Sequence, residues 1–598
     1  MAASSYAAKI VAIPNDVDVP QYSKWTDAWG LALFVFLFSL GVRLLYFVEV
    51  RNDPLLHVPV LDSAVYDQWA QEILKGDWLS RSRPVLALSP GYAYWRAIQG
   101  IVLGRGFAAT AVVQFFLGAG TVLFVFALAF RLARNKYSAL LCAMVYALYG
   151  PAVCYEAMPI TAAWINFLNT LALLFVLSGF TMRNCWIAGL LIGLSSLFRP
   201  TVLLFAALFP LVVFLHHREN HLHSAKLMGR FLLGLVLPLG LFMGRNLIVA
   251  GEARFSAGSG SMNLFIGNSK YSNGTYVHFG DIESGNPTTQ LEDYRRAAST
   301  RLKREVTMRE SDAFWRQEAF RYMREHPLEW GRLEFRKLAL LVSTYELGNN
   351  VSYYYFLEKS KVLRASALVT FPVLVFLAAL GLWQFLKGGL KINTSYISIL
   401  SIYCVSYVVV GLMFFVLGEY RFALVPGLLG LAAPGIGAVF LWVRSHSWRK
   451  LGGLAAAIAI ATTIVHAQSK KLEKHEFRSK ELAVAYTAAG DVFKGQGRLD
   501  ESVSRFNAAI ALDPSSPLAP IKLSAIYMAQ RRYEDASLVL KRVILVNDKV
   551  WQIHGNLGIC SFQLGRLQEA EDYLRTAHEL YPSPENKARY LMLRSMKK

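Results

Sequence analysis

The chain has 598 residues, of which 54% are hydrophobic and only 17% are charged. Together with a mean hydropathy of +0.35, this composition excludes an ordinary soluble protein and indicates a membrane protein. In a soluble protein a net charge of +21 would suggest nucleic-acid binding, but here the basic residues lie largely in short loops between apolar runs. In such loops they set membrane topology and contact lipid head groups, so nucleic acid is not an expected partner.

Eleven apolar runs are candidates for crossing a bilayer, which takes roughly 20 apolar residues. They are Trp29–Val48, Phe107–Phe130, Ser138–Cys154, Ile160–Gly179, Ile187–Phe198, Val202–Leu215, Phe231–Val249, Ala365–Phe385, Tyr396–Leu417, Phe422–Trp442 and Leu451–Ile464. The first run is expected to remain as a signal anchor, because no short apolar region with a cleavage site precedes it. We therefore expect a cytoplasmic segment over residues 1–28 and a transmembrane domain over residues 29–470.

Basic residues follow the second, fourth, sixth, eighth and tenth runs, for example Arg131, Arg183, Lys226, Lys387 and Arg444. All of these turns fall on one side of the membrane if the N-terminus is cytoplasmic. The loops 49–106 and 251–361 and the C-terminal tail then lie on the outer side. The sequence thus predicts a multi-pass membrane protein whose two long loops and C-terminal tail face the outer side.

The first outer loop contains Asp62 and Asp67, in the first long segment that cannot lie in hydrocarbon. A carboxylate just outside the bilayer can take a proton from an acceptor hydroxyl while a lipid-linked donor lies beside it. Our hypothesis is that Asp62 is this general base, with Asp67 in a secondary role. The alternative is that Asp62 only caps the helix predicted over Ser63–Leu74.

The long loop 251–361 begins with turn residues and becomes helical in pattern from Thr288 to about Tyr345. It contains Asn268, and Glu346 stands near its end. A polar loop of this length is too long for a simple connection between two spans. We expect it to carry part of the functional site.

From about Lys471 the chain becomes polar and repeats with a period of 34 residues. The register is kept by Gly490, Ser524 and Gly558, by Gly497, Arg531 and Gly565, by Pro514, Asp548 and Pro582, and by Phe506, Leu540 and Leu574. Small residues recur where paired antiparallel helices would approach closely. This is the tetratricopeptide pattern, and three repeats are enough to stack a core. We predict a soluble α-solenoid over residues 483–598, with Asn586–Lys598 as its capping helix.

Four arginines lie at the ends of apolar runs or within them, where a charge is costly and suggests function. They are Arg43, Arg199, Arg245 and Arg421, and the predicted topology puts all four toward the outer face. Because an arginine holds a phosphate through two parallel hydrogen bonds, they are candidates for binding a lipid phosphate. Snorkelling to the lipid surface is the alternative for each. Glu156 is either a second acid of the pocket or the partner of one of these arginines.

The five cysteines give no sign of a disulfide framework or of a zinc site. The chain has no Cys-x-x-Cys pair and no His cluster at ligand spacing. We therefore expect neither a structural metal nor a cofactor.

Several short motifs together resemble the GT-C glycosyltransferases. The resemblance is strongest to the protein O-mannosyltransferase group (family 39) and its bacterial relatives, which include the lipid A aminoarabinose transferases. The motifs, spread over about residues 29–465, are Asp62 to Ala70 (Asp-x-x-x-Tyr-x-x-x-Ala), Ser89-Pro90-Gly91-Tyr92, Phe198-Arg199-Pro200, Arg245-Asn246, Gly267-Asn268, His326-Pro327, Glu346 and Tyr420-Arg421-Phe422 with Pro426. Membrane spans joined to outward tetratricopeptide repeats also resemble the transmembrane O-mannosyltransferases of animals.

This resemblance implies a polyprenyl-phosphate-linked sugar as donor and an inverting transfer that uses neither a nucleotide sugar nor a metal. It assigns the role of base to the aspartate of the first outer loop, here Asp62. The same motifs place Tyr66, Tyr92, Asn268 and Glu346 in the acceptor and sugar pocket. Family members often have an adjacent acidic pair where this chain has Asp62-Ser63.

The leading hypothesis is a membrane glycosyltransferase that acts at the outer, periplasmic face of a bacterial plasma membrane on a protein, glycan or lipid acceptor. Its repeats would bind the acceptor protein or an assembly partner. One alternative is a transferase similar to O-antigen ligases or polymerases, which would use a lipid-pyrophosphate glycan donor. The other is a non-enzymatic membrane scaffold that only presents the repeats.

Overall fold

The computed structural model describes residues 25–277, 288–387, 394–472, 477–546, 548–581 and 583–596. Helices and connecting turns make up this part of the chain, and it contains no strand. The expected all-α fold is confirmed. The first 24 residues of the predicted cytoplasmic segment lie outside the described residues, as does Pro582 of the repeat register.

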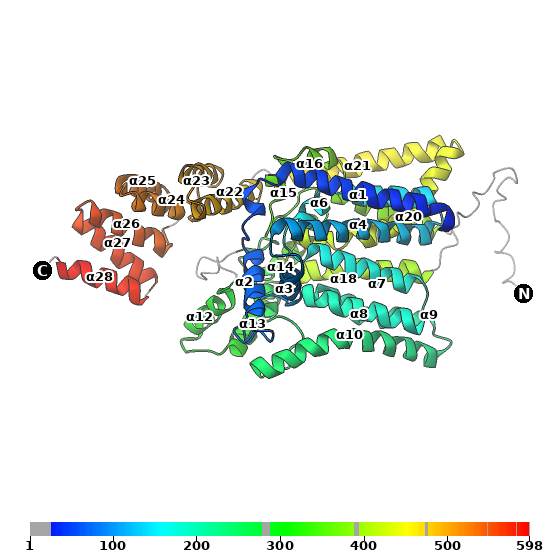
Figure 1. Ribbon diagram of the computed structural model, residues 1–598, viewed down its shortest axis with the longest axis horizontal. Helices are drawn as coiled ribbons and strands as arrows, with labels where there is room; N and C mark the ends of the chain where they lie inside the picture. The colour runs from blue at the N-terminus through cyan, green and yellow to red at the C-terminus, as the bar shows by residue number, and fades with distance from the viewer. Residues whose placement is uncertain are drawn as a thin grey trace, which may run out of the picture.

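Long apolar helices form a bundle in which they run side by side, as α1, α4, α8 and α10 do in Figure 1. The helices of the bundle are α1 (Trp29–Val50), α4 (Phe107–Ala133), α5 (Lys136–Ala147), α6 (Gly150–Ala157), α7 (Ala162–Leu177), α8 (Met182–Phe198), α9 (Leu203–His216), α10 (His221–Ala250), α17 (Phe371–Leu386), α18 (Thr394–Met413), α20 (Val425–Arg444) and α21 (Trp448–Leu472). Except for α21, these helices contribute apolar side chains to one large cluster, because no single helix can bury its whole surface alone.

Seven helices among the described residues are long and apolar enough to cross a membrane. An eighth span results if α5 and α6, which are bent by 53° to each other, are counted as one. Shorter apolar helices at Ala162–Leu177, Met182–Phe198 and Pro200–His216 coincide with three more of the predicted runs. The structure therefore supports a membrane protein, and the count of eleven spans stays a prediction.

Shorter helices from the two long polar loops cover one end of this bundle. They are α2 (Asp62–Leu74) and α3 (Gly91–Val102) from the first loop, and α11 (Gly260–Gly267), α12 (Gln290–Leu302), α13 (Met308–Glu325), α14 (Pro327–Leu341) and α15 (Tyr353–Leu357) from the second. Helix α16 (Lys361–Ser366) begins at the last residue of the second loop. In Figure 1, α2 lies across the end of the bundle, and α12 and α13 lie beside it. The helical pattern expected from Thr288 to Tyr345 is confirmed by α12, α13 and α14.

Three pairs of antiparallel helices and a last single helix follow the bundle. They are α22 (Arg478–Gly495), α23 (Leu499–Leu512), α24 (Leu518–Ala529), α25 (Tyr533–Ile544), α26 (Trp551–Gln563), α27 (Leu567–Leu580) and α28 (Pro584–Met596). A Cβ atom on Gly490 would lie 2.6 Å from Phe506, and one on Gly558 would lie 2.7 Å from Leu574. The small residues of the 34-residue register thus stand where the two helices of a pair touch.

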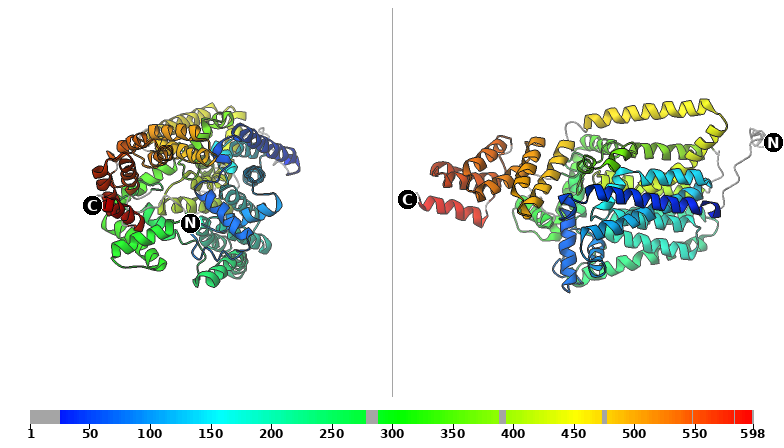
Figure 2. Two further views of the ribbon diagram at one scale, coloured as in Figure 1. Left: turned by 60° about the vertical axis from the view of Figure 1, so that its left-hand side comes forward. Right: turned by 45° about the horizontal axis from the view of Figure 1, so that its top comes forward.

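The solenoid extends from the end of the bundle that α2 and α12 cover (Figures 1 and 2). Its first helix, α22, packs against the loops, since Leu482 and Ala485 belong to the same apolar cluster as Leu347 and Tyr355 of the long loop. Both polar loops and the repeats therefore gather at one end of the molecule. Which side of the membrane this end faces stays a prediction.

Candidate active site around Asp62

Asp62 is the first residue of α2 and not its cap. The cap position is taken by Leu61, whose φ of 52° is rare for a residue other than glycine, and no side chain caps the helix. The Asp62 carboxylate instead accepts a hydrogen bond of 2.9 Å from the side-chain amide of Asn350. Backbone strain of this kind is often found at functional sites, where neighbouring contacts hold it in place.

An ion pair between Arg199 and Glu419 lies close enough to Asp62 to change its protonation. Arg199 ends α8 and donates to Glu419 of α19 (Gly418–Phe422) at 2.9 Å. Burial raises the pKa of the Asp62 carboxyl to about 6, and the charge of Glu419 acts in the same direction. The Asn350 hydrogen bond and the charge of Arg199 lower it. Asp62 is thus a carboxylate whose proton affinity is tuned toward neutral pH, as a general base requires.

Aromatic rings enclose this cluster of charges. The Arg199 guanidinium lies 4.7 Å from the centre of the Tyr420 ring, and burial with the Asp62 charge raises the pKa of Tyr66. Tyr66 in turn packs edge-on against Tyr92, with 5.1 Å between ring centres. Of the two predicted pocket tyrosines, Tyr66 therefore borders Asp62, whereas the hydroxyl of Tyr92 points away and donates to Gln114.

Two buried polar groups near Arg199 have no partner among the described residues. They are one carboxylate oxygen of Glu419, Oε1, and the side-chain amide of Asn166. Both residues border a cavity of about 10 Å³, beside Arg199 and Tyr420. An unsatisfied buried carboxylate oxygen is costly, so it marks a place where a ligand or water would bind favourably.

A larger cavity of about 540 Å³ lies beside the Asp62 segment. Val60, Leu61 and Ser63 contribute to its wall from the first loop, and Asn350 from the second. Lys480 and Glu481 of α22 face them from the first repeat. A volume of this size is typical of small-molecule sites, which span about 300–1,000 Å³.

Three of the four arginines that were predicted to bind a phosphate, Arg43, Arg245 and Arg421, are hydrogen-bonded to groups of the protein instead. Arg43 is buried in α1 and donates to Glu156 at 2.5 Å, so Glu156 is the partner of an arginine. Arg245 donates to the backbone carbonyls of Leu79, Ser80, Arg83 and Pro84 and so fixes the turn after α2.

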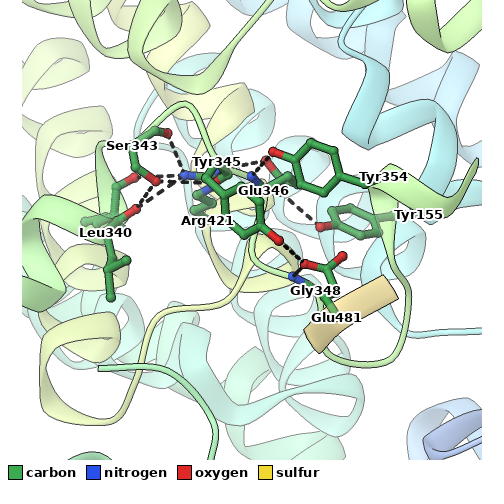
Figure 3. A network of polar contacts seen from close by, with 10 residues as sticks. Tyr155, Leu340, Ser343, Tyr345, Glu346, Gly348, Tyr354, Arg421 and Glu481 are labelled. Carbon is green, nitrogen blue, oxygen red and sulfur yellow. Dashed lines mark hydrogen bonds and ion pairs between the residues drawn. The ribbon is translucent and has the colours of Figure 1, made fainter. Parts of the chain in front are cut away.

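Arg421 belongs to a separate buried network (Figure 3). Its guanidinium donates to Glu346 at 2.5 Å and to the carbonyls of Ser343 and Tyr345. Glu346 also accepts a hydrogen bond from Tyr155 at 3.0 Å. The side chains of Arg43 and Arg421 are 0% exposed, against 18% for Arg199, which leaves Arg199 as the arginine of these three that a ligand can reach.

Two further predicted residues serve the packing of the loops. Asp67 accepts a hydrogen bond of 2.8 Å from the buried Arg96 and thereby joins α2 to α3. Asn268 donates to the carbonyls of Leu264 and Met413 and accepts hydrogen bonds from Trp330 and Lys337. Neither side chain contacts Asp62.

The sequence did not single out Glu419 and Asn350 as site residues. Glu419 adjoins Arg421 in the sequence Gly418-Glu419-Tyr420-Arg421, and a carboxylate at the start of an apolar run is as costly as an arginine there. The cost of placing a carboxylate there could therefore have identified Glu419 as a site residue. Asn350 is one of many amides in a polar loop, so nothing local distinguishes it.

Within the described residues no group of three or more His, Cys, Asp or Glu side chains is placed to hold a metal ion. The transfer without metal or cofactor that the family resemblance implies stays a prediction.

Comparison with known proteins identifies the C-terminal region. The family model of the tetratricopeptide repeat matches residues 487–536 and 521–583. No curated protein matches the chain. Solved structures similar to the repeats include the first TPR domain of the human RPAP3 protein, at 20% identity over 19% of this chain and 92% of that chain, and the Arabidopsis OM64 TPR domain, at 18% identity over 20% and 98%. Both have a TM-score of 0.19.

The bundle has a distant structural neighbour. The Archaeoglobus fulgidus oligosaccharyltransferase, solved in complex with Zn and sulfate, is 16% identical over 78% of this chain and 57% of that chain, with a TM-score of 0.35. The C-terminal match is the specific one, and it confirms tetratricopeptide repeats within residues 487–583.

Proposed function

We propose that this protein is an integral membrane glycosyltransferase that moves a sugar from a polyprenyl-phosphate donor to an acceptor hydroxyl, with Asp62 as general base. The observation that carries the proposal is the setting of the Asp62 carboxylate. Asp62 is close enough to Arg199, a partly exposed arginine at the end of an apolar helix, for their charges to interact, and its neighbours Leu61 and Ser63 line a cavity of about 540 Å³ beside the repeats. A donor anchored in lipid and an acceptor from the aqueous side would meet at this point.

Each group has a role in such a transfer. Asp62 takes the proton from the acceptor hydroxyl as the new glycosidic bond forms, while the bond between the sugar and the phosphate breaks and the lipid phosphate leaves as an anion. Arg199 stabilises the charge that develops on that phosphate. Glu419 holds the Arg199 guanidinium at 2.9 Å, and its electrostatic effect keeps the Asp62 carboxyl basic. Tyr66 borders the carboxylate and excludes water from it.

The other arginines are assigned a different role in this proposal. Arg43, Arg245 and Arg421 stabilise the bundle and its loops through Glu156, the Leu79–Pro84 carbonyls and Glu346. Binding of the donor phosphate is therefore assigned to Arg199 alone. The repeats are assigned to the acceptor or to an assembly partner, because stacked repeats form extended binding surfaces.

The proposal is tested by offering the purified protein two donors that carry the same sugar, one linked through a polyprenyl monophosphate and one through a pyrophosphate. Sugar transfer from the monophosphate donor to a hydroxyl acceptor is expected. The Asp62→Asn protein serves as the negative control. Transfer from the pyrophosphate alone would favour a ligase-like enzyme. Absence of transfer from both, by folded wild-type protein, would favour a scaffold and contradict the proposal.

A further inference from the structure

A single loop connects Asp62 with the first repeat. Residues 345–352 follow α14 and lead into α15, and Asn350 near their middle donates to the Asp62 carboxylate. At its start the loop is held by the buried Arg421, which donates to the carbonyl of Tyr345 at 2.5 Å and to Glu346 (Figure 3). The contacts that hold this loop on its two sides therefore determine the position of Asn350.

On the repeat side the loop is held by Glu481, one turn into α22 (Figure 3). One carboxylate oxygen of Glu481 accepts hydrogen bonds from the Tyr345 hydroxyl at 2.6 Å and from the backbone N–H of Gly348 at 3.3 Å. A Cβ atom on Gly348 would lie 2.5 Å from the other oxygen of Glu481. A side chain at position 348 would therefore collide with the Glu481 carboxylate, and glycine leaves room for it.

Other contacts fix α22 against the same loop and its neighbours. The rings of Phe477 and Tyr345 stack at 6.2 Å between centres, and the rings of Tyr486 and Tyr355 lie 5.5 Å apart. The guanidinium of Arg478 lies 4.9 Å from the centre of the Tyr354 ring. The first repeat is therefore packed on the loop rather than joined to it by a linker alone. Glu481 provides the polar contact within this apolar interface.

We propose that Glu481 is a positioning residue for Asp62. Through Tyr345 and Gly348 it fixes the loop that presents Asn350 to the carboxylate, so the first repeat is a structural part of the active site. This inference rests on the proposed function, because it assumes that Asp62 is the base. Its consequence is that binding to the repeats and chemistry at Asp62 are coupled through one short loop.

The test compares Glu481→Ala with Glu481→Gln in the full-length protein. Because one oxygen of Glu481 accepts both hydrogen bonds, the amide oxygen of Gln can replace it, whereas Ala removes both. Glu481→Ala is expected to lower kcat on the order of 10²-fold, as displacements of about 1 Å do, with KM for the polyprenyl-phosphate donor unchanged. Glu481→Gln is expected to stay near wild type. Glu219→Ala, at an exposed acid in the turn between α9 and α10, is the matched control.

A pH profile separates positioning from a general loss of structure. Since the Asn350 hydrogen bond lowers the pKa of Asp62, displacing Asn350 moves the acid limb of kcat/KM to higher pH. This displacement is expected for Glu481→Ala and not for Glu481→Gln. If Glu481→Ala does not fold, as judged by thermal melting, Tyr345→Phe replaces it. That variant removes one of the two hydrogen bonds and is expected to move the limb in the same direction.

Wild-type kcat and an unmoved acid limb in Glu481→Ala, or in Tyr345→Phe if it takes its place, would overturn the inference. Equal impairment of Glu481→Gln and Glu481→Ala would also overturn it, because hydrogen bonding would then not be the cause. If Asp62→Asn is inactive while Glu481→Ala behaves as wild type, only this inference fails. If Asp62→Asn is fully active, the proposed function itself fails.

Discussion

Asn350 and Asp62 are 288 residues apart in the chain and are joined by a hydrogen bond of 2.9 Å, in which the amide donates to the carboxylate. Two further hydrogen bonds join the same two loops. The Tyr355 hydroxyl donates to the Asp53 carboxylate, and the Ser360 hydroxyl donates to the Glu49 carboxylate. Three acids, Glu49, Asp53 and Asp62, are therefore paired in reverse order with donors at the end of the second loop. This pairing holds the two loops together over the end of the bundle and places Asp62 between them.

The pH dependence of the transfer follows from this contact. Asp62 acts as base in its ionised form, and its pKa is about 6, so kcat/KM is expected to fall tenfold for each pH unit below about 6. In Asn350→Ala the hydrogen bond that favours the ionised form is lost, and the acid limb moves to higher pH. One hydrogen bond contributes about 1 kcal/mol, so the shift is expected to be just under one unit. An identical acid limb in both proteins would contradict this role of Asn350.

Arg199→Lys tests whether the Arg199 guanidinium binds the phosphate of the donor. Lysine keeps the positive charge but loses the planar fork that binds a phosphate through two hydrogen bonds. We expect kcat to fall on the order of 10²-fold, the cost of removing one preorganised donor from a transition state. Arg183→Lys, at the opposite end of α8 and exposed, is the control and should retain wild-type rates. Equal rates in the two variants would remove Arg199 from the mechanism.

The pair formed by Arg421 and Glu346 is expected to serve stability. Both side chains are buried, so Glu346→Ala leaves an arginine without its countercharge and should destabilise the protein by about 3–5 kcal/mol. Asp535→Ala removes the partner of the exposed Arg532 and should cost at most about 1 kcal/mol. Thermal melting in detergent compares the two variants. Similar melting temperatures, with loss of donor binding in Glu346→Ala, would instead favour a role at the donor.

Glu481 also predicts how stability changes with pH. Burial raises its pKa from 4.5 to about 7, so the folded protein binds this proton more tightly than the unfolded chain does. The contribution is complete below about pH 4.5 and is lost as the pH rises through 7, a difference on the order of 3 kcal/mol. The melting temperature of the wild type should therefore fall between pH 5 and pH 8, and that of Glu481→Gln should fall less. Parallel decreases in the two proteins would contradict this assignment.

The sequence predicts the repeats well, because their signal is local and periodic. Gly497, Arg531 and Gly565 are 34 residues apart, and all three have a positive φ in the turn between two helices. Gly490 and Gly558 stand at helix contacts. Each position therefore does in the structure what its register indicates. The family match confirms the predicted tetratricopeptide repeats within residues 487–583, and the structure has three helix pairs there and at their flanks.

The site is predicted only in part, because its geometry depends on distant segments. Glu419 and Arg421 are two residues apart on the short helix α19, and residues at this spacing point in different directions. The structure accordingly turns Glu419 toward Arg199 and Arg421 toward Glu346. From the sequence we predicted that this segment belongs to the site, but we chose Arg421 as its functional residue and not Glu419. The partners Asn350 and Glu481 follow from the packing of the long loop, which no local pattern encodes.

The central claim is that Asp62 removes the proton from the acceptor, and one rate comparison tests it most directly. Asp62→Asn keeps the size of the side chain and the contact with Asn350 but cannot accept a proton. Glu219→Gln, at an exposed acid in the turn between α9 and α10, is the matched control. Single-turnover transfer from a polyprenyl-phosphate donor is expected to be about 10²–10⁴-fold slower in Asp62→Asn and unchanged in the control, with equal melting temperatures. Wild-type transfer by folded Asp62→Asn protein would contradict the account.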